Sequence, residues 1–313
     1  MNEPRVSILI PTCDGAATLR ETLSAVAKQA APFAFEVVAV DSGSTDETLA
    51  ILEGSVDRLI QIERERFDHG QTRNFGVEAC RGELVVLLVQ DATPASETWL
   101  VELTRPLLDD RRLAGSFARQ IPRPGASAIT RSALQGWVAC RAQPRTSWLG
   151  GFAELERLAP AERHDRCAFD NVCSCIRRST WEAHRFEATP IAEDLAWARE
   201  VLLAGYGIAY APDAGVFHSH ERSVRYELWR TMFVHQRLHQ LFGLSTIPSL
   251  GHLFQGVTLA LVSHMRVLFR DHGVRIPPRQ IARGLGLSVA WPLGQYLGGR
   301  AARSGRVLPR RGV

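Results

Sequence analysis

The chain has 313 residues, of which 45% are hydrophobic and 22% charged, so it can hold one large domain or two ordinary ones with a substantial core. Its formal net charge is +4, but no acidic residue follows Asp271, whereas eight arginines do. Such a basic tail indicates contact with an anionic surface. Aromatic and basic residues are not interleaved as in a recognition module, so we expect no nucleic-acid partner.

The start of the chain and its cysteines bear on the compartment. Met1–Arg5 leads directly into a strand pattern, from which we expect cytoplasmic synthesis without export. Six cysteines are compatible with reduced thiols there. Cys173 and Cys175, with Cys167 and His164 nearby, could bind zinc. Their spacing is not that of a C-x2-C finger, and alternation along a strand explains the pair more simply.

Strands and helices alternate over the first hundred residues. Continuous apolar runs predict strands that are buried on both faces. The predicted strands are Val6–Ile10, Phe35–Val40, Arg58–Ile62 and Leu84–Val89. Helices are predicted from Thr18 to before Pro32, after a capping box Ser44-x-x-Glu47, over Thr72–Cys80, and from Ser96 to Leu108. This alternation predicts an α/β fold with a mostly parallel sheet flanked by helices.

The alternation then stops and resumes. Residues 119–170 contain several prolines and aromatics, and we expect an irregular lid or binding loop there. Val172–Ile176 is predicted as a strand and Glu193–Ala204 as a helix. Two further segments, Ile208–Tyr210 and Val216–His220, follow the glycines at 205 and 207.

A helical pattern begins at Val224, so we divide the chain into a main domain, 1–222, and a helical, arginine-rich extension, 223–313. Residues 238–265 and 284–299 carry no Lys, Arg, Asp or Glu. Neither is a run of about 20 mostly apolar residues, the length that spans a bilayer. Two interpretations remain open: amphipathic segments on a membrane surface, or a helical core or oligomer contact.

Two aspartates stand at the ends of predicted parallel strands: Asp41 follows Val40 directly, and Asp91 follows Val89 after Gln90. Asp41 and Asp91 therefore lie where open α/β sheets bind ligands. A carboxylate at position 41 can accept hydrogen bonds from a nucleobase imide or a ribose hydroxyl. Asp91 suits a divalent metal that also binds a diphosphate; the alternative is that it caps the next helix.

Later polar residues add possible chemistry. Arg73, near a helix N-terminus, suits phosphate oxygens, unless it pairs with Asp68 or Glu78. Glu193-Asp194 begins a helix between apolar segments, so the pair either caps that helix or supplies a general base toward a hydroxyl. His218 and His220 flank a serine after a strand and could bring an imidazole to a metal.

The motifs in their order resemble the GT-A glycosyltransferases of family two, in particular the bacterial rhamnosyltransferase-like group. They extend from residue 6 to about 220. The matching elements are Val6-Ser-Ile-Leu-Ile-Pro-Thr12, Val40-Asp-Ser-Gly-Ser-Thr-Asp46, His69-Gly-Gln-Thr-Arg-Asn74, Leu88-Val-Gln-Asp-Ala92, Ala192-Glu-Asp194 and Val216-Phe-His-Ser-His220. The resemblance implies a Rossmann-like GT-A domain and an inverting transfer of a sugar, with Mg²⁺ or Mn²⁺, from a nucleotide diphosphate to a hydroxyl.

The resemblance also implies roles for individual residues. Asp194 matches the catalytic base, supported by Glu193. Asp91 matches the last carboxylate of the D-x-D metal motif, whose first carboxylate is replaced by Val89, and His218 is implied as the second metal ligand. The residues implied to line the donor pocket are Pro11, Thr12, Asp14, Asp41, Arg73 and Asp91.

The implied donor is a nucleotide-diphosphate sugar, dTDP-rhamnose by likeness, and the implied acceptor is a glycan or lipid-linked glycan of surface polysaccharide. We expect a cytoplasmic protein, with an anionic membrane surface and a second copy of the chain as further possible partners. One alternative is a nucleotidyltransferase, although Pro11-Thr-Cys-Asp-Gly15 lacks the lysine and second glycine of such loops. The other alternative is a catalytically weak nucleotide-sugar-binding protein, because Val89 replaces the first carboxylate of the metal motif.

Overall fold

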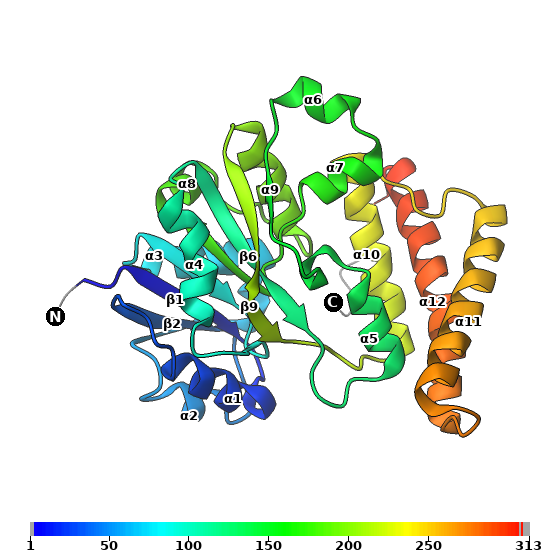
Figure 1. Cartoon of the computed structure of the whole chain (residues 1–313), viewed down its shortest axis with the longest axis horizontal. Helices are drawn as coiled ribbons and strands as arrows, with labels where there is room; N and C mark the ends of the chain where they lie inside the picture. Colours follow the sequence, from blue (N-terminus) through cyan, green and yellow to red (C-terminus); the bar gives the residue numbers. More distant parts are fainter. Residues whose placement is uncertain (1–2, 307, 309–313) are drawn as a thin grey trace.

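One twisted sheet forms the centre of the molecule and carries helices on both faces (Figure 1). A computed structural model describes residues 3–306 and 308. Within these residues the strand order is β3-β2-β1-β4-β8-β6-β9-β5, and β7 pairs with β9. The strands are β1 Val6–Thr12, β2 Phe35–Asp41, β3 Arg58–Gln61, β4 Leu84–Leu88, β5 Thr93–Pro94, β6 Leu113–Ile121, β7 Arg145–Ser147, β8 Cys173–Arg177 and β9 Gly207–Phe217.

The helices of the described residues also follow the sequence prediction closely in the first hundred residues. They are α1 Ala16–Ala27, α2 Thr48–Leu52, α3 His69–Ala79, α4 Trp99–Asp109, α5 Ala128–Gln135, α6 Phe152–Arg157, α7 Pro160–Arg166, α8 Arg178–Ala183, α9 Glu193–Leu203, α10 Val224–Phe242, α11 Leu250–His272 and α12 Pro278–Arg303, with 3-10 turns η1 Arg64–Arg66 and η2 Val138–Cys140. The predicted capping box is wrong, because α2 begins at Thr48 and Glu47 is its N-cap residue.

The four predicted N-terminal strands are confirmed as a parallel unit in the order β3-β2-β1-β4. Alternating side chains of β1 enter two separate cores: Leu9 packs in one, and Ile8 and Ile10 pack in the other. Burial on both faces explains why these strands read as continuous apolar runs. Because parallel strands end at one edge of the sheet, Thr12 lies in register with Asp41.

The rest of the sheet is mixed. β8 pairs antiparallel with both β4 and β6, while β6 and β9 are parallel to each other. The α/β fold is thus confirmed, although parallel pairing is limited to two parts of the sheet. The region 119–170 is more ordered than predicted, since β6 extends to Ile121 and short helices follow. The two segments predicted around 208–220 form one strand, β9.

Cys173 and Cys175 point into the core from β8, as strand alternation predicted. All six cysteines are free thiols. Among the described residues, neither Cys173 nor Cys175 belongs to a group with the geometry of a metal site.

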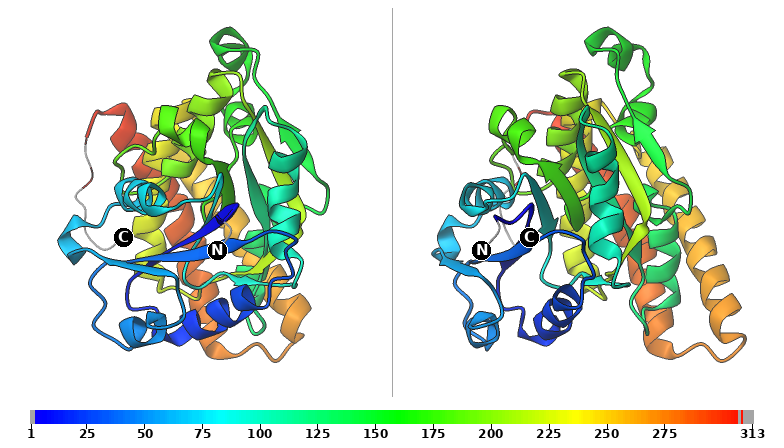
Figure 2. Two further views of the ribbon diagram at one scale, coloured as in Figure 1. Left: turned by 90° about the vertical axis from the view of Figure 1, so that its left-hand side faces the viewer. Right: turned by 60° about the vertical axis from the view of Figure 1, so that its left-hand side comes forward.

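The C-terminal helices stand on the side of the sheet away from the N-terminal strands (Figures 1 and 2). α12 packs between α10 and α11. A Cβ atom at Gly294 would lie 2.9 Å from the Leu228 carbonyl oxygen, and one at Gly298 would collide with the Met232 carbonyl. These glycines therefore allow α12 to approach the α10 backbone closely. Within residues 3–306 and 308, every helix is too short or too polar to cross a bilayer.

Candidate active site

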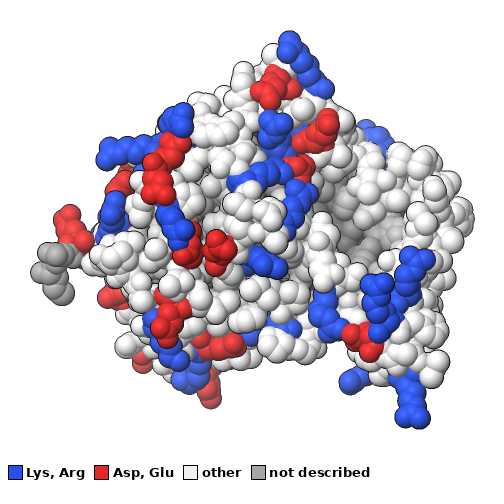
Figure 3. All heavy atoms as spheres, in the orientation of Figure 1, with Lys and Arg blue, Asp and Glu red and all other residues white. Residues whose placement is uncertain are grey.

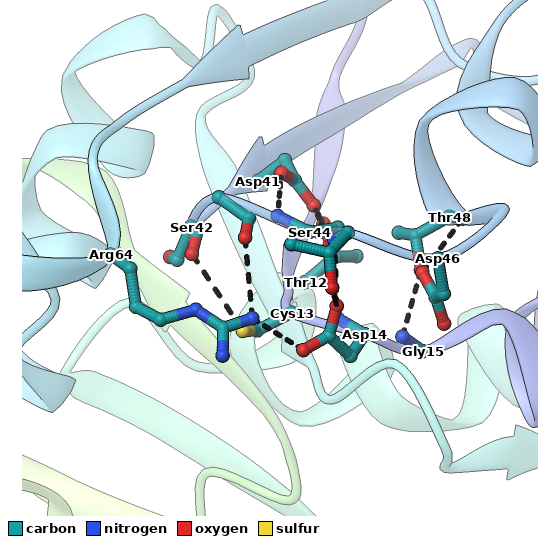
Figure 4. Close-up of polar contacts among 12 residues, drawn as sticks. Thr12, Cys13, Asp14, Gly15, Asp41, Ser42, Ser44, Asp46, Thr48 and Arg64 are labelled. Atoms are coloured by element: carbon teal, nitrogen blue, oxygen red, sulfur yellow. Dashed lines mark hydrogen bonds and ion pairs between the residues drawn. The ribbon is translucent and has the colours of Figure 1, made fainter.

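Hydroxyl groups hold Asp41 at the carboxyl ends of β1 and β2 (Figure 4). Thr12 Oγ1 donates to Asp41 Oδ2 over 2.9 Å, and Ser44 Oγ donates to the same oxygen over 2.5 Å. The Ser44 N–H donates to Oδ1 over 2.9 Å. Ser44 is therefore a partner of Asp41 rather than the helix cap that the sequence predicted.

Asp14 lies beside this group, just beyond Pro11 and Thr12 of β1, with its backbone in the left-handed region at φ 46°. Its Oδ1 accepts the Thr45 N–H over 2.8 Å, and its Oδ2 pairs with Arg64 (Figure 4). The Thr45 backbone hydrogen bond and Arg64 lower the pKa of Asp14 to about 2. Sequence reasoning missed Arg64, although it follows β3 much as Asp41 ends β2.

Gln90 joins this end of the sheet to β4. The Cys13 N–H donates to Gln90 Oε1 over 2.9 Å, and Gln90 Nε2 donates to the Cys13 carbonyl over 3.0 Å. The two hydrogen bonds lock the loop after β1 against the residue that precedes Asp91. The predicted pocket residues of β1 and the predicted metal ligand are thus held in a fixed relation.

Two histidines lie beside Asp91. His218 Nε2 lies 3.7 Å from Asp91 Oδ1, and His220 Nε2 lies 3.4 Å from Asp91 Oδ2. The three possible ligand atoms all lie within 4.8 Å of one another. Asp91 is not a helix cap, because Thr98 precedes α4. The sequence therefore named two members of this cluster, Asp91 and His218, and considered His220 only as an alternative imidazole.

The electrostatics of the cluster fit a divalent cation. Burial lowers the pKa of His218 to about 4, although Asp91 acts in the opposite direction. Burial also lowers the pKa of His220. Both imidazoles are consequently neutral near pH 7, the form that binds metals. Mg²⁺ prefers oxygen ligands, so two neutral imidazoles beside a carboxylate favour Mn²⁺ or another transition-metal ion over Mg²⁺.

Glu193 and Asp194 open α9 after Ala192, which adopts the left-handed conformation at φ 61°. Asp194 Oδ2 accepts the Asn171 N–H over 3.3 Å, and its Oδ1 accepts the Leu195 N–H over 2.8 Å. Asn171 Nδ2 donates to Glu193 Oε1 over 3.2 Å. The helix start thus orients both carboxylates, and Asn171, which the sequence did not single out as a carboxylate partner, binds both.

The two carboxyl groups differ in proton affinity. Burial, and then the charges of Glu193 and Asp170, raise the pKa of Asp194 well above its ordinary value. Burial also opposes ionisation of Glu193, but Arg73, His69 and Asn171 outweigh it and lower the pKa of Glu193. An ionised carboxylate beside one with a raised pKa is an arrangement that suits general base chemistry.

Arg73 is buried next to this pair. Its Nη1 lies 3.0 Å from Glu193 Oε1 and donates to the His69 carbonyl over 2.9 Å. The predicted alternative partners are wrong: Asp68 caps α3, and Glu78 pairs with Arg185. Arg73 therefore links the start of α3 to Glu193, the neighbour of the candidate base Asp194.

A polar chain joins the Asp91 cluster to the Glu193–Asp194 pair. His218 Nδ1 lies 2.9 Å from Gln120 Oε1, and the Gln120 amide donates to Asp170. Asn171, which follows Asp170, contacts both catalytic candidates. Sequence analysis missed Gln120 because it did not recognise β6, and it missed Asp170 because that residue's partners, Gln120 and Trp137, lie far away in the chain.

Comparisons with known proteins point to glycosyltransferases. Residues 7–150 match the model of the family described as Glycosyl transferase family 2. The O-antigen chain rhamnosyltransferase RfbN of Salmonella typhimurium is 27% identical over 230 residues, which cover 72% of this chain and 70% of that protein. The O-antigen chain rhamnosyltransferase WbaN of Salmonella anatum is 29% identical over 231 residues, with the same two coverages of 72% and 70%.

The mannosyltransferase PcManGT from Pyrobaculum calidifontis, solved with GDP-Man and Mn²⁺, has a similar fold. The TM-score is 0.54 at 18% identity, over 99% of this chain and 77% of that chain. These similarities lead to one conclusion. The chain is a glycosyltransferase: residues 7–150 match glycosyl transferase family 2, and the chain is similar in sequence to two bacterial O-antigen chain rhamnosyltransferases and in fold to a solved mannosyltransferase.

Proposed function

We propose that the protein is an inverting glycosyltransferase that moves L-rhamnose from dTDP-rhamnose to a hydroxyl of a lipid-linked glycan during surface polysaccharide synthesis. The observation that carries this proposal is the link between a candidate cation site at Asp91 and a partly buried carboxylate of raised pKa at Asp194. The similarity to two O-antigen chain rhamnosyltransferases supports the choice of sugar and product.

In this proposal the ends of β1 and β2 bind the nucleoside. Pro11, Thr12, Asp14 and Asp41 line that part of the site, with Asp41 oriented by Thr12 and Ser44. Asp91, His218 and His220 would hold Mn²⁺ or Mg²⁺, which supplies positive charge to the diphosphate leaving group. Arg73 adds positive charge near the donor through its position beside Glu193.

Asp194 would act as the general base. As the acceptor oxygen forms its bond to C1 of the sugar, its proton passes to the Asp194 carboxylate. The bond from C1 to the diphosphate oxygen breaks on the opposite face, and the nucleoside diphosphate leaves with the electron pair. Burial and the neighbouring negative charges give Asp194 a higher proton affinity than an exposed aspartate, which favours this transfer.

The test is release of nucleoside diphosphate from a panel of nucleotide sugars, with and without Mn²⁺, in the presence of a lipid-linked acceptor. We expect acceptor-dependent dTDP release from dTDP-rhamnose, and its loss in Asp194→Asn with donor binding retained. Pyrophosphate formation would instead identify a nucleotidyltransferase. Donor binding with no turnover of any sugar would identify a binding protein, and either outcome overturns the proposal.

We further propose that residues 223–313 form an extension that attaches the enzyme to the inner face of the cell membrane. α11 buries only His264 and Leu268 of its residues, while Phe254 is 73% exposed and Leu259, Val262 and Phe269 are also exposed. A 23-residue helix with large apolar side chains exposed to water indicates a surface that binds another molecule or a membrane.

Charge favours a lipid surface there. Arg266, Arg270, Arg275 and Arg279 are exposed at the end of α11 and the start of α12, and basic side chains gather there in Figure 3. The one acidic residue of this segment, Asp271, pairs with Arg131. Apolar side chains beside exposed arginines are typical of helices that lie on anionic membranes. Arg310 and Arg311 of the predicted basic tail lie outside the described residues.

Co-sedimentation with phosphatidylglycerol-containing vesicles tests this attachment. We expect the double change Phe254→Ser and Phe269→Ser to release the protein, while Phe152→Ser, at an equally exposed site on α6, leaves binding unchanged. The sequence also predicts weaker attachment when residues 300–313 are removed. Unchanged binding of the double variant, together with a lower mass in light scattering, would identify α11 as a contact between two copies instead.

A further inference from the structure

We infer that Gln120 is a positioning residue, which holds His218 with its proton on Nδ1 so that Nε2 is free to bind the divalent cation. This inference rests on the proposed role of the cluster Asp91, His218 and His220. Neither Gln120 nor its partner Asp170 contacts that cluster's carboxylate, so both would act through the imidazole.

The backbone brings Gln120 and His218 together. β6 and β9 run parallel, and the His218 N–H donates to the Ile121 carbonyl over 2.9 Å just beyond β9. His218 Nδ1 then lies 2.9 Å from Gln120 Oε1. Both side chains are buried, with exposed fractions of 9% and 7%. Water therefore does not replace Gln120 as the partner of Nδ1.

Asp170 determines which way the Gln120 amide faces. Its carboxylate accepts the Trp137 Nε1–H over 3.0 Å, the Val172 N–H over 2.9 Å and the Gln120 amide. A carboxylate only accepts hydrogen bonds, so the NH₂ group of Gln120 faces Asp170 and its carbonyl oxygen faces His218. That oxygen also only accepts, and Nδ1 must therefore carry the proton.

The consequence appears on the other side of the ring. With the proton on Nδ1, Nε2 presents a lone pair toward Asp91 Oδ1, 3.7 Å away. Two hydrogen-bond acceptors facing each other in a partly buried site are unfavourable unless a cation or a hydrogen-bond donor lies between them. A divalent cation satisfies both, and outer-sphere hydrogen bonds of this kind fix the ring and its tautomer in metal sites.

The tautomer itself is measurable in the metal-free wild-type protein. Nitrogen chemical shifts of His218, assigned by comparison with His218→Gln, should show a protonated Nδ1 and an unprotonated Nε2. The opposite tautomer would overturn the inference, whatever the enzyme's activity proves to be. Because this measurement needs no metal and no substrate, it separates the inference from the proposed function.

Mn²⁺ affinity of the full chain, measured by calorimetry without nucleotide, tests the consequence. We expect Gln120→Met to weaken Mn²⁺ binding by about 10- to 100-fold, the usual effect of losing an outer partner of a ligand. Gln135→Met, on the exposed face of α5, is the matched control and should bind as the wild type does. An unchanged affinity in Gln120→Met would refute the positioning role.

A paired exchange guards against a trivial folding defect. Gln120→Glu places two carboxylates together and should weaken Mn²⁺ binding. Adding Asp170→Asn restores a donor toward position 120 while an acceptor still faces His218, so the double variant should recover most of the affinity. A double variant no better than Gln120→Glu alone would overturn the inference. Wild-type protein that binds no Mn²⁺ would refute the proposed cation site, while the tautomer measurement would still decide the role of Gln120.

Discussion

Arg73 Nη1 lies 3.0 Å from Glu193 Oε1, and this ion pair joins the start of α3 to the start of α9. Both side chains are almost fully buried, with exposed fractions of 8% and 6%. The arginine keeps Glu193 ionised despite its burial, and the charge of Glu193 in turn raises the pKa of Asp194. Arg73 therefore acts on the candidate base only through Glu193, whose charge adds to the larger effect of burial on the pKa of Asp194.

Removing Arg73 should destabilise the fold. In Arg73→Met the buried Glu193 carboxylate loses its counter-charge, a change that typically costs about 3–5 kcal/mol. Urea unfolding measures it. Adding Glu193→Gln should recover much of the loss, because the uncompensated charge disappears. Arg20→Met is the control: that arginine forms an exposed pair with Glu47, and its loss should cost less than about 1 kcal/mol. Equal effects at the two positions would contradict this account.

The acid limb of the pH profile of kcat/KM should have an apparent pKa above the usual value for an aspartate, which is about 3.9. Because burial, Glu193 and Asp170 raise the pKa of Asp194, a larger share of the enzyme carries a protonated, inactive base at mildly acidic pH. Glu193→Gln removes one of these negative charges, so the limb of kcat/KM should move to lower pH. A limb that stays in place would assign it to another group.

His220 should contribute to cation binding although the sequence did not commit to it. Its Nε2 lies 3.4 Å from Asp91 Oδ2. We expect Mn²⁺ to raise the melting temperature of the wild type, and His220→Ala and Asp91→Asn each to lose most of that increase. His252→Ala, an exposed histidine on α11, should keep it. A full Mn²⁺ response in His220→Ala would leave only Asp91 and His218 as ligands.

Ala192 should be a strained position. It has φ 61°, a conformation that costs a residue with a Cβ about 1–2 kcal/mol relative to the right-handed region. Ala192→Gly should therefore raise the free energy of unfolding by about 1 kcal/mol, after the greater freedom of glycine in the unfolded chain is subtracted. The same change at Ala204, which is right-handed at the end of α9, should lower it. A loss of stability at both sites would show that Ala192 is not strained.

Local patterns were sufficient for the N-terminal half of the fold. Apolar runs of β1, β2 and β4 are buried on both faces, so hydrophobicity alone revealed them. β6 was missed because Leu113–Ile121 contains Gly115, Ser116, Arg119 and Gln120, and its partners β8 and β9 lie far along the chain. The predicted capping box was wrong for a similar reason. The Ser44 hydroxyl donates to the Asp41 carboxylate and accepts the Asp14 N–H instead of capping the helix.

Residue types and their spacing within short segments were enough to reveal the resemblance to a family, the strand-end carboxylates Asp41 and Asp91, and the pair Glu193-Asp194. The partners of these residues became clear from the folded chain: Arg73 pairs with Glu193, His220 lies beside Asp91, and Gln120 with Asp170 lies behind His218. Partners across a sheet are set by strand order and register. Those depend on how the whole chain packs, and the separation of two residues along the chain does not specify them.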